Sequence, residues 1–163
     1  MPSGRTHDRI AIILLAPIYL VLHHCIGLDI LQSLILSISI LFSQLMFGPD
    51  LDLPSVQYKR WGPLKFLWIP YRMFFRHRSR FTHGIVLGPV TRIIYLSIIL
   101  ILFELLLNYF WNIKIVYINS FNLKNIYVFW ADKNNFLITI GLFAGAAIHT
   151  FTDKLASFFK DLF

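Results

Sequence analysis

The sequence predicts an all-α integral membrane protein, a four-helix bundle with an interfacial segment of aromatic and basic residues. Of its 163 residues, 57% are hydrophobic, and the mean hydropathy is +0.66, above what ordinary soluble domains show. Four apolar runs also approach the roughly 20 residues that a helix needs to cross a bilayer. We therefore expect one membrane domain covering residues 1–163, with spans at about 10–28, 30–47, 93–113 and 136–152.

The first two runs are predicted to form an antiparallel hairpin. A basic start before the run at 10–28 is compatible with a signal peptide, but no small-residue cleavage site follows, which favours a retained helix. The run at 30–47 carries no charged residue, and the turn at Asp29 between the two runs is very short. His23 and His24, near the far end of the first run, are expected to anchor that end of the helix.

Gly48 and Pro49 end the second run, and residues 55–76 then interleave aromatic with basic side chains. Pro63 and Pro70 predict breaks in any helix there. Trp and Tyr favour the membrane interface, and Lys and Arg favour anionic head groups, so we expect this segment on the membrane surface. Stacking on single-stranded nucleic acid is the alternative. The flanking spans argue against it, and no nucleic-acid partner is expected although the net charge is +7.

The second half of the chain holds the other two spans. The run at 93–113 contains Glu104, and the connector at 114–135 fits either a strand hairpin or an interfacial helix. The run at 136–152 is rich in Gly and Ala, which let membrane helices approach closely. The single cysteine, Cys25, excludes an internal disulfide framework.

Charge asymmetry predicts the orientation in the membrane. An up-and-down order of spans places the N-terminus, residues 48–92 and the C-terminus on one side. Twelve of the 15 Lys and Arg residues fall on that side, and only Lys114, Lys124 and Lys133 fall on the other. Because basic residues favour cytoplasmic loops, we expect a multi-pass inner or plasma membrane protein with both termini in the cytoplasm.

The same side collects the residue types that bind metals. We predict a divalent metal site, with Zn expected and Mn or Fe as alternatives, because imidazoles and carboxylates together suit these ions. A carboxylate near a bilayer is costly unless it is paired or metal-bound. The alternative is a salt-bridge network with Arg5, Arg78 and Arg80. The candidate ligands are His7, Asp50, Asp52, His77, His83, His149 and Asp153.

Residues 77–84 place two imidazoles, two guanidiniums and two hydroxyls within eight positions. Arg grips phosphate or carboxylate groups bidentately, so the stretch fits a metal site that handles an anion. The alternative is a loop that anchors acidic lipid head groups. Ser79 is a conceivable nucleophile, although a loop serine is more often a hydrogen-bonding or capping residue.

Five motifs carry a resemblance to a known family. They are PSGRTHDR (2–9), FGPDLD (47–52), YKRWGPL (58–64), HRSRFTHG (77–84) and HTFTD (149–153). With them the chain resembles a family of small bacterial membrane proteins regarded as metal-binding and most familiar from cyanobacteria. The Pro-Asp-x-Asp, His-Arg-x-x-x-Thr-His and His-x-x-x-Asp elements are more distantly similar to membrane-bound, metal-dependent hydrolases. That second resemblance implies hydrolytic activity.

Three functions follow from these expectations. The first is metal-dependent hydrolysis of a phosphate-containing or lipid substrate, with Asp50 or Asp52 as metal ligand or base and with Arg78 and Arg80 neutralising the anion. The second is a metal-clamped membrane scaffold or sensor, which a closed coordination shell would favour. The third, an ion transporter, requires ionisable residues at mid-membrane. Glu104 alone qualifies there, and a hydrogen bond to a neighbouring helix explains it better.

Overall fold

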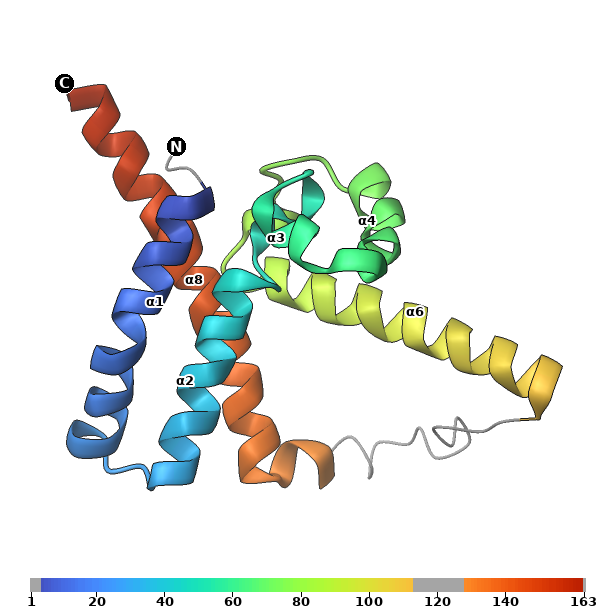
Figure 1. Cartoon of the computed structure of the whole chain (residues 1–163), viewed down its shortest axis with the longest axis horizontal. Helices are drawn as coiled ribbons and strands as arrows, with labels where there is room; N and C mark the ends of the chain where they lie inside the picture. Colours follow the sequence, from blue (N-terminus) through green and yellow to red (C-terminus); the bar gives the residue numbers. More distant parts are fainter. Residues whose placement is uncertain (1–3, 113–127, 163) are drawn as a thin grey trace.

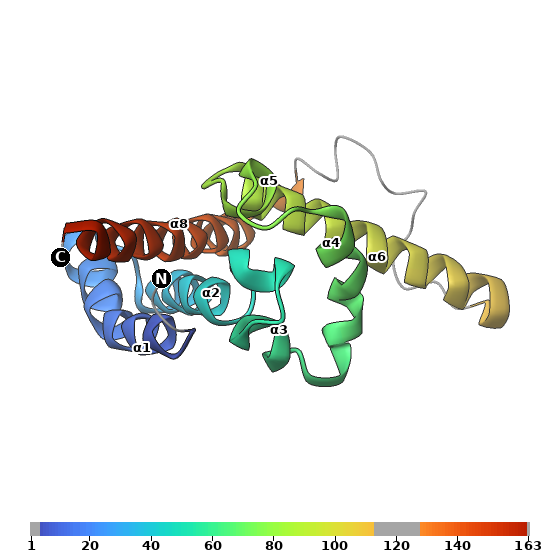
Figure 2. The same cartoon turned by 90° about the horizontal axis from the view of Figure 1, so that it is seen from above.

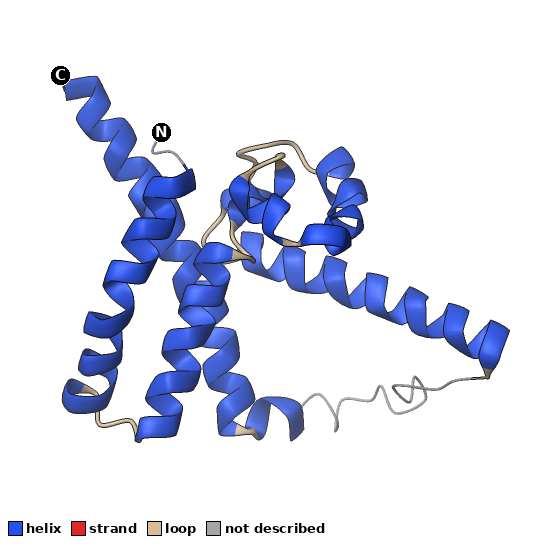
Figure 3. Cartoon of the chain, viewed as in Figure 1, coloured by secondary structure: helices blue, strands red, loops and turns tan. Residues whose placement is uncertain are grey.

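A computed structural model describes residues 4–112 and 128–162 of the chain, and every regular element within them is helical (Figure 3). This confirms the all-α class. Four helices are long and apolar enough to cross a membrane. They are α1 (Gly4–Leu20), which continues as the π-helical turn η1 (Val21–Cys25), α2 (Ile30–Leu45), α6 (Leu87–Trp111) and α8 (Lys133–Leu162).

Two of these helices are longer than the sequence predicts. Helix α6 begins at Leu87 rather than at 93, because Pro89 lies in its first turn, where a missing backbone N–H costs nothing. Helix α8 continues to Leu162 rather than ending at 152. Of the connector 114–135, residues 114–127 lie outside the described residues, and residues 128–131 form a helical turn before α8.

Helices α1 and α2 form the expected hairpin, with a tight turn at its base (Figure 1). The turn is held by side chains: His23 Nδ1 lies 2.9 Å from the Leu28 carbonyl oxygen, and the Asp29 carboxylate caps α2 by accepting from the Gln32 N–H at 2.8 Å. An N-cap acceptor satisfies one of the four unpaired N–H groups at a helix start.

Helix α8 packs closely along α2 over the Gly/Ala-rich stretch. A Cβ atom at Gly145 would lie 2.5 Å from the Ile40 carbonyl oxygen, and one at Gly141 would lie 2.4 Å from Ser39 Cβ. This approach lets Ser43 Oγ donate to the Leu142 carbonyl at 2.6 Å. Small residues therefore set the spacing of this helix pair, as membrane helix packing generally requires.

Helix α6 diverges from the other three long helices and approaches them only at its N-terminal end (Figure 1). Many of its large apolar side chains are exposed, as expected of a helix surrounded by lipid. At its buried end Arg92, 1% exposed, donates from Nη1 to the Thr82 carbonyl at 3.0 Å.

Between α2 and α6 lies a cap of short helices, grouped beside the ends of the long ones when seen from above (Figure 2). Pro63 and Pro70 each lie at the second position of a new element, which explains why the segment is not one continuous helix. The cap comprises η2 (Pro49–Asp52), α3 (Val56–Arg60), η3 (Gly62–Trp68), α4 (Ile69–Phe74) and α5 (Arg80–His83).

The cap has a core of its own, which surface patterning does not predict. Trp68 and Tyr71 are fully buried and pack with Phe47 and Leu51, whereas Phe74 remains exposed. Burial raises the pKa of the Tyr71 hydroxyl to about 12. The aromatic residues thus divide between an inner cluster that supports η2 and an outer set that suits the membrane interface.

Candidate metal centre

Four separate parts of the chain bring the candidate ligands together at one end of the long helices. His7 comes from the start of α1, and Asp50 and Asp52 come from η2. The loop before α5 supplies His77, and α5 itself supplies His83. Helix α8 supplies His149 and Asp153, which lie one turn apart on one face of the helix. Each of these seven side chains lies within ion-pair distance of at least one other.

The η2 turn presents its two carboxylates because the chain is tightly constrained before it. A Cβ atom at Gly48 would lie 2.3 Å from Gln57 Nε2, so any larger residue there would displace the end of the Gln57 side chain. Asp52 is 5% exposed, and its Oδ1 accepts from His77 Nδ1 at 2.9 Å. The second oxygen of Asp52 lies 3.8 Å from His83 Nδ1.

His83 is oriented by the residue that precedes it. Thr82 Oγ1 donates to the Ser79 carbonyl at 3.3 Å and lies 3.0 Å from His83 Nδ1. A hydroxyl has a single proton to donate. Because the Thr82 hydroxyl donates its proton to the Ser79 carbonyl, its oxygen must act as the acceptor toward the His83 Nδ1–H. His83 Nε2 then carries the lone pair, and it lies 3.7 Å from Asp50 Oδ1. This arrangement is the one that a metal ligand needs.

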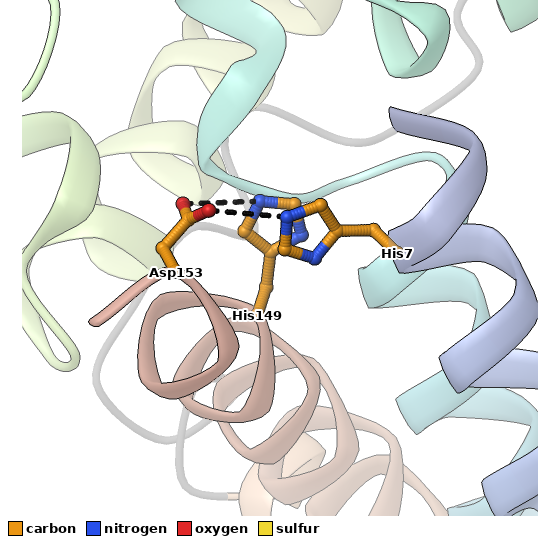
Figure 4. A group of neighbouring side chains, drawn as sticks. All are labelled: His7, His149 and Asp153. Atoms are coloured by element: carbon orange, nitrogen blue, oxygen red, sulfur yellow. Dashed lines mark hydrogen bonds and ion pairs between the residues drawn. The ribbon is translucent and has the colours of Figure 1, made fainter. Parts of the chain in front are cut away.

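His7, His149 and Asp153 form the other half of the centre (Figure 4). The two imidazole rings stack with centroids 4.0 Å apart, and both Nε2 atoms face the Asp153 carboxylate, at 3.1 Å from His7 and 3.7 Å from His149. His149 Nε2 is also 3.4 Å from Asp50 Oδ2, which connects this half to the η2 turn.

The geometry and donor set fit a divalent metal. Three groups of three side chains each place one donor atom per residue within 4.8 Å of one another, and His83 and Asp153 are shared between groups. Among the described residues, four buried donor atoms of the centre have no hydrogen-bond partner: Asp52 Oδ2, His83 Nε2, His149 Nε2 and Asp153 Oδ2. Each has only longer ion-pair contacts of 3.4–3.8 Å among these residues. Burying a polar atom without a hydrogen bond costs up to about 1–3 kcal/mol, and metal coordination would remove that cost.

The guanidiniums lie beside this centre rather than inside it. In the described part of the chain, the ion pairs of the three buried or half-buried aspartates of the centre are all with histidines. Arg78 and Arg80 are exposed instead, and Arg78 adopts a left-handed backbone with φ 59°. That conformation is uncommon for residues other than glycine. The described residues form one Asp–Arg ion pair, between Asp8 and Arg60. The network considered from the sequence also involves Arg5, whose side chain lies outside what the structure describes.

Two supporting residues were not singled out by sequence analysis. Gln57 Nε2 donates to the Gln44 carbonyl at 2.6 Å and lies 3.4 Å from His149 Nδ1. Arg92 donates to the Thr82 carbonyl and so positions the α5 turn. Thr82 itself belongs to the His-Arg-x-x-x-Thr-His element noted in the sequence, whereas Gln57 lies in a basic and aromatic segment that hides it.

The remaining candidates lie outside the centre. His23 serves the hairpin turn, His24 is exposed, and Glu104 is buried in α6. None of them belongs to a metal-compatible group among the described residues.

Comparison with known proteins agrees with this geometry. The protein family described as "Uncharacterized metal-binding protein (DUF2227)" matches residues 2–163. The chain belongs to this family. A protein of Aquifex aeolicus (strain VF5) named "Uncharacterized protein" is 43% identical over 60 residues, which cover 36% of this chain and 42% of that protein. The chain thus spans less than half the length of this relative. No solved structure matches this chain.

Proposed function

We propose that this member of the metal-binding family is a membrane-embedded, metal-dependent hydrolase that acts on a phosphate-containing or lipid substrate. One observation carries the proposal: a cluster of imidazoles and carboxylates has buried donor atoms without a hydrogen bond, and exposed arginines line a groove together with two of its members. Zn is the proposed ion, with Mn and Fe as alternatives, because mixed nitrogen and oxygen donors suit them. A bound divalent ion supplies Lewis acidity, which favours attack by water near neutral pH.

The chain's own residues divide into ligands, a base and anion-binding groups. His7, His83, His149 and Asp153 supply donors, and Asp52 is held in place by His77. Asp50, whose side chain is 21% exposed, is the carboxylate most accessible to a water molecule and can accept its proton. Arg78 and Arg80 neutralise the anion. Ser79 is assigned no role as a nucleophile; its backbone carbonyl accepts the hydrogen bond that positions Thr82.

The proposed substrate lies on the cytoplasmic side of the membrane. The centre lies at the end of the long helices where the N-terminus and the basic cap lie. Because basic residues favour the cytoplasmic side of membranes, the proposed location is a multi-pass inner or plasma membrane protein with both termini and the centre facing the cytoplasm.

A non-catalytic clamp is the second candidate, favoured by the way His7 joins α1 to α8. In that case the ion ties helix ends together and every coordination position is filled by protein. The centre has seven candidate ligands, whereas a closed tetrahedral site uses four, so the centre has enough ligands for two ions. The two candidate functions differ in one respect: a hydrolase would leave one coordination position of the ion open for substrate, whereas a scaffold or sensor would leave none.

The experiment is an activity panel on protein purified in detergent. Protein loaded with Zn, Mn or Fe is incubated with phosphomonoesters, phosphodiesters and phospholipids, with Asp50→Asn as the inactive control. Hydrolysis that depends on metal and on Asp50 supports the enzyme. Metal-replete protein that is inert toward the whole panel, and that unfolds when chelator is added, favours the clamp.

A further inference from the structure

We propose that a groove between α5 and α8 binds a phosphomonoester group, which enters the metal centre from this side. The groove encloses about 590 Å³ and is lined by residues of both helices, including Arg80, His83, Asp153 and Lys154. Its volume lies in the range of small-molecule sites, about 300–1,000 Å³. The proposal deepens the proposed function and rests on it, because His83 and Asp153 are shared with the candidate metal centre.

The charge of the groove selects the ligand. Arg78, Arg80 and Lys154 line it, and Asp153 is the one carboxylate among its described lining residues. Within the described residues, neither Arg80 nor Lys154 forms an ion pair. Asp153 is next to Lys154 in sequence, but its carboxylate faces His7 and His149. Two cations from different helices therefore remain available to a dianion, and a tetrahedral phosphate offers oxygens to both.

Hydroxyl groups complete the polar lining. Ser79, Thr150 and Ser157 all line the groove, and Thr150 Oγ1 donates to the His83 carbonyl at 3.5 Å. This contact links α8 to α5 at the point where the groove meets the metal centre. A phosphate held by Arg80 and Lys154 is thereby placed beside His83 and Asp153, which line the groove and each belong to two of the three metal-compatible groups.

One apolar aromatic side chain lies among the described lining residues of the groove: Phe158, which is 62% exposed. An exposed aromatic ring beside the cations suits a ligand that carries an acyl chain. The phosphate therefore has two possible sources: the head group of a membrane lipid or a water-soluble phosphomonoester.

The test measures binding of phosphonates, which share the dianionic head group and are not hydrolysed. Methylphosphonate and dodecylphosphonate are titrated calorimetrically into the full chain in detergent, with empty micelles as blank. The variants are Arg80→Gln, Lys154→Gln and the charge-retaining Arg80→Lys. Lys65→Gln, which removes an exposed cation outside the groove, is the matched control. Thermal unfolding verifies that each variant is folded.

We expect wild type and Lys65→Gln to bind equally, and Arg80→Gln and Lys154→Gln each to bind about 10–100-fold more weakly, as for loss of a charged hydrogen bond. Arg80→Lys should retain most of the affinity. Tighter binding of dodecylphosphonate identifies a lipid source, and equal binding a soluble one. Equal binding by all folded variants, or by none, overturns the groove. If phosphonates bind as expected but no phosphomonoester is hydrolysed with any metal, the hydrolase fails and the groove stands.

Discussion

His7 Nε2 on α1 lies 3.1 Å from Asp153 Oδ1 on α8, so the two side chains join helices whose residues are 146 positions apart in the sequence. The His7 ring also stacks on that of His149. Because α1 otherwise packs mainly on α2, this contact closes the N-terminal helix onto the C-terminal one. The candidate metal centre is therefore also a structural junction.

The first prediction concerns this junction. His7→Ala and Asp153→Asn should each lower stability in detergent, by about 3–5 kcal/mol if the pair behaves as a broken buried ion pair. A double-mutant cycle measured by thermal or denaturant unfolding should give a coupling energy of about 0.5–3 kcal/mol. If metal bridges the pair, chelator should reduce the coupling. Coupling near zero in metal-loaded protein would contradict the junction.

The second prediction concerns the hydroxyl that orients His83. Thr82→Val keeps the shape but removes the acceptor for His83 Nδ1–H, so metal affinity should fall about 10–100-fold, as for other groups that orient a ligand. Competition with a metal chelator measures the affinity. Thr91→Val, which removes the hydroxyl bonded to the Leu87 carbonyl, is the control and should leave affinity unchanged. Equal affinities for both variants would remove Thr82 from the site.

The third prediction concerns helix spacing. Gly145→Val places methyl groups where Ile40 and Ser43 already lie, so α8 must move away from α2 and stability should fall by about 1–3 kcal/mol or more. Ile138→Val, at an exposed position of the same helix, is the control and should cost little. Thermal unfolding in detergent compares the two. A Gly145→Val protein as stable as its control would show that the helices are not closely packed there.

The fourth prediction concerns topology. In a Cys25→Ser background, Ser55→Cys in the cap and Asn134→Cys at the start of α8 report on opposite ends of the long helices. A membrane-impermeant thiol reagent added to intact cells should label Asn134→Cys and spare Ser55→Cys. Labelling of the cap cysteine from outside would place the metal centre on the outer side and overturn the proposed orientation.

The long helices and their order could be predicted from the sequence, because a helix that spans lipid requires a long apolar run and because Gly and Pro residues mark where such runs end. The capping role of Asp29 and the close approach at Gly141 follow from local chemistry in the same way. The angle at which α6 diverges from the other long helices could not be predicted in this way. It depends on the packing of Arg92 and the α5 turn at one end of α6, and the periodicity of the sequence carries no information about that packing.

The candidate ligands could be proposed from the sequence because charged and imidazole side chains are few in this chain, and the span order places most of them at one end. What the pattern could not supply is their pairing. Histidines rather than arginines face the aspartates, Gln57 contacts His149, and Trp68 and Tyr71 turn inward to support η2. These arrangements arise from tertiary contacts between residues far apart in sequence.

The central claim is that the centre binds a metal, and elemental analysis of protein purified in detergent tests it most directly. Wild type, His83→Ala and a control variant, His24→Ala, are analysed for Zn, Mn and Fe by mass spectrometry. His24 is an exposed histidine in η1, at the opposite end of the first long helix from the centre. We predict at least one divalent ion per chain in wild type and His24→Ala, and clear loss in His83→Ala, because removing an imidazole leaves the ion under-coordinated. Metal-free wild type that binds none of these ions on reconstitution, or equal metal content in all three proteins, would contradict the account.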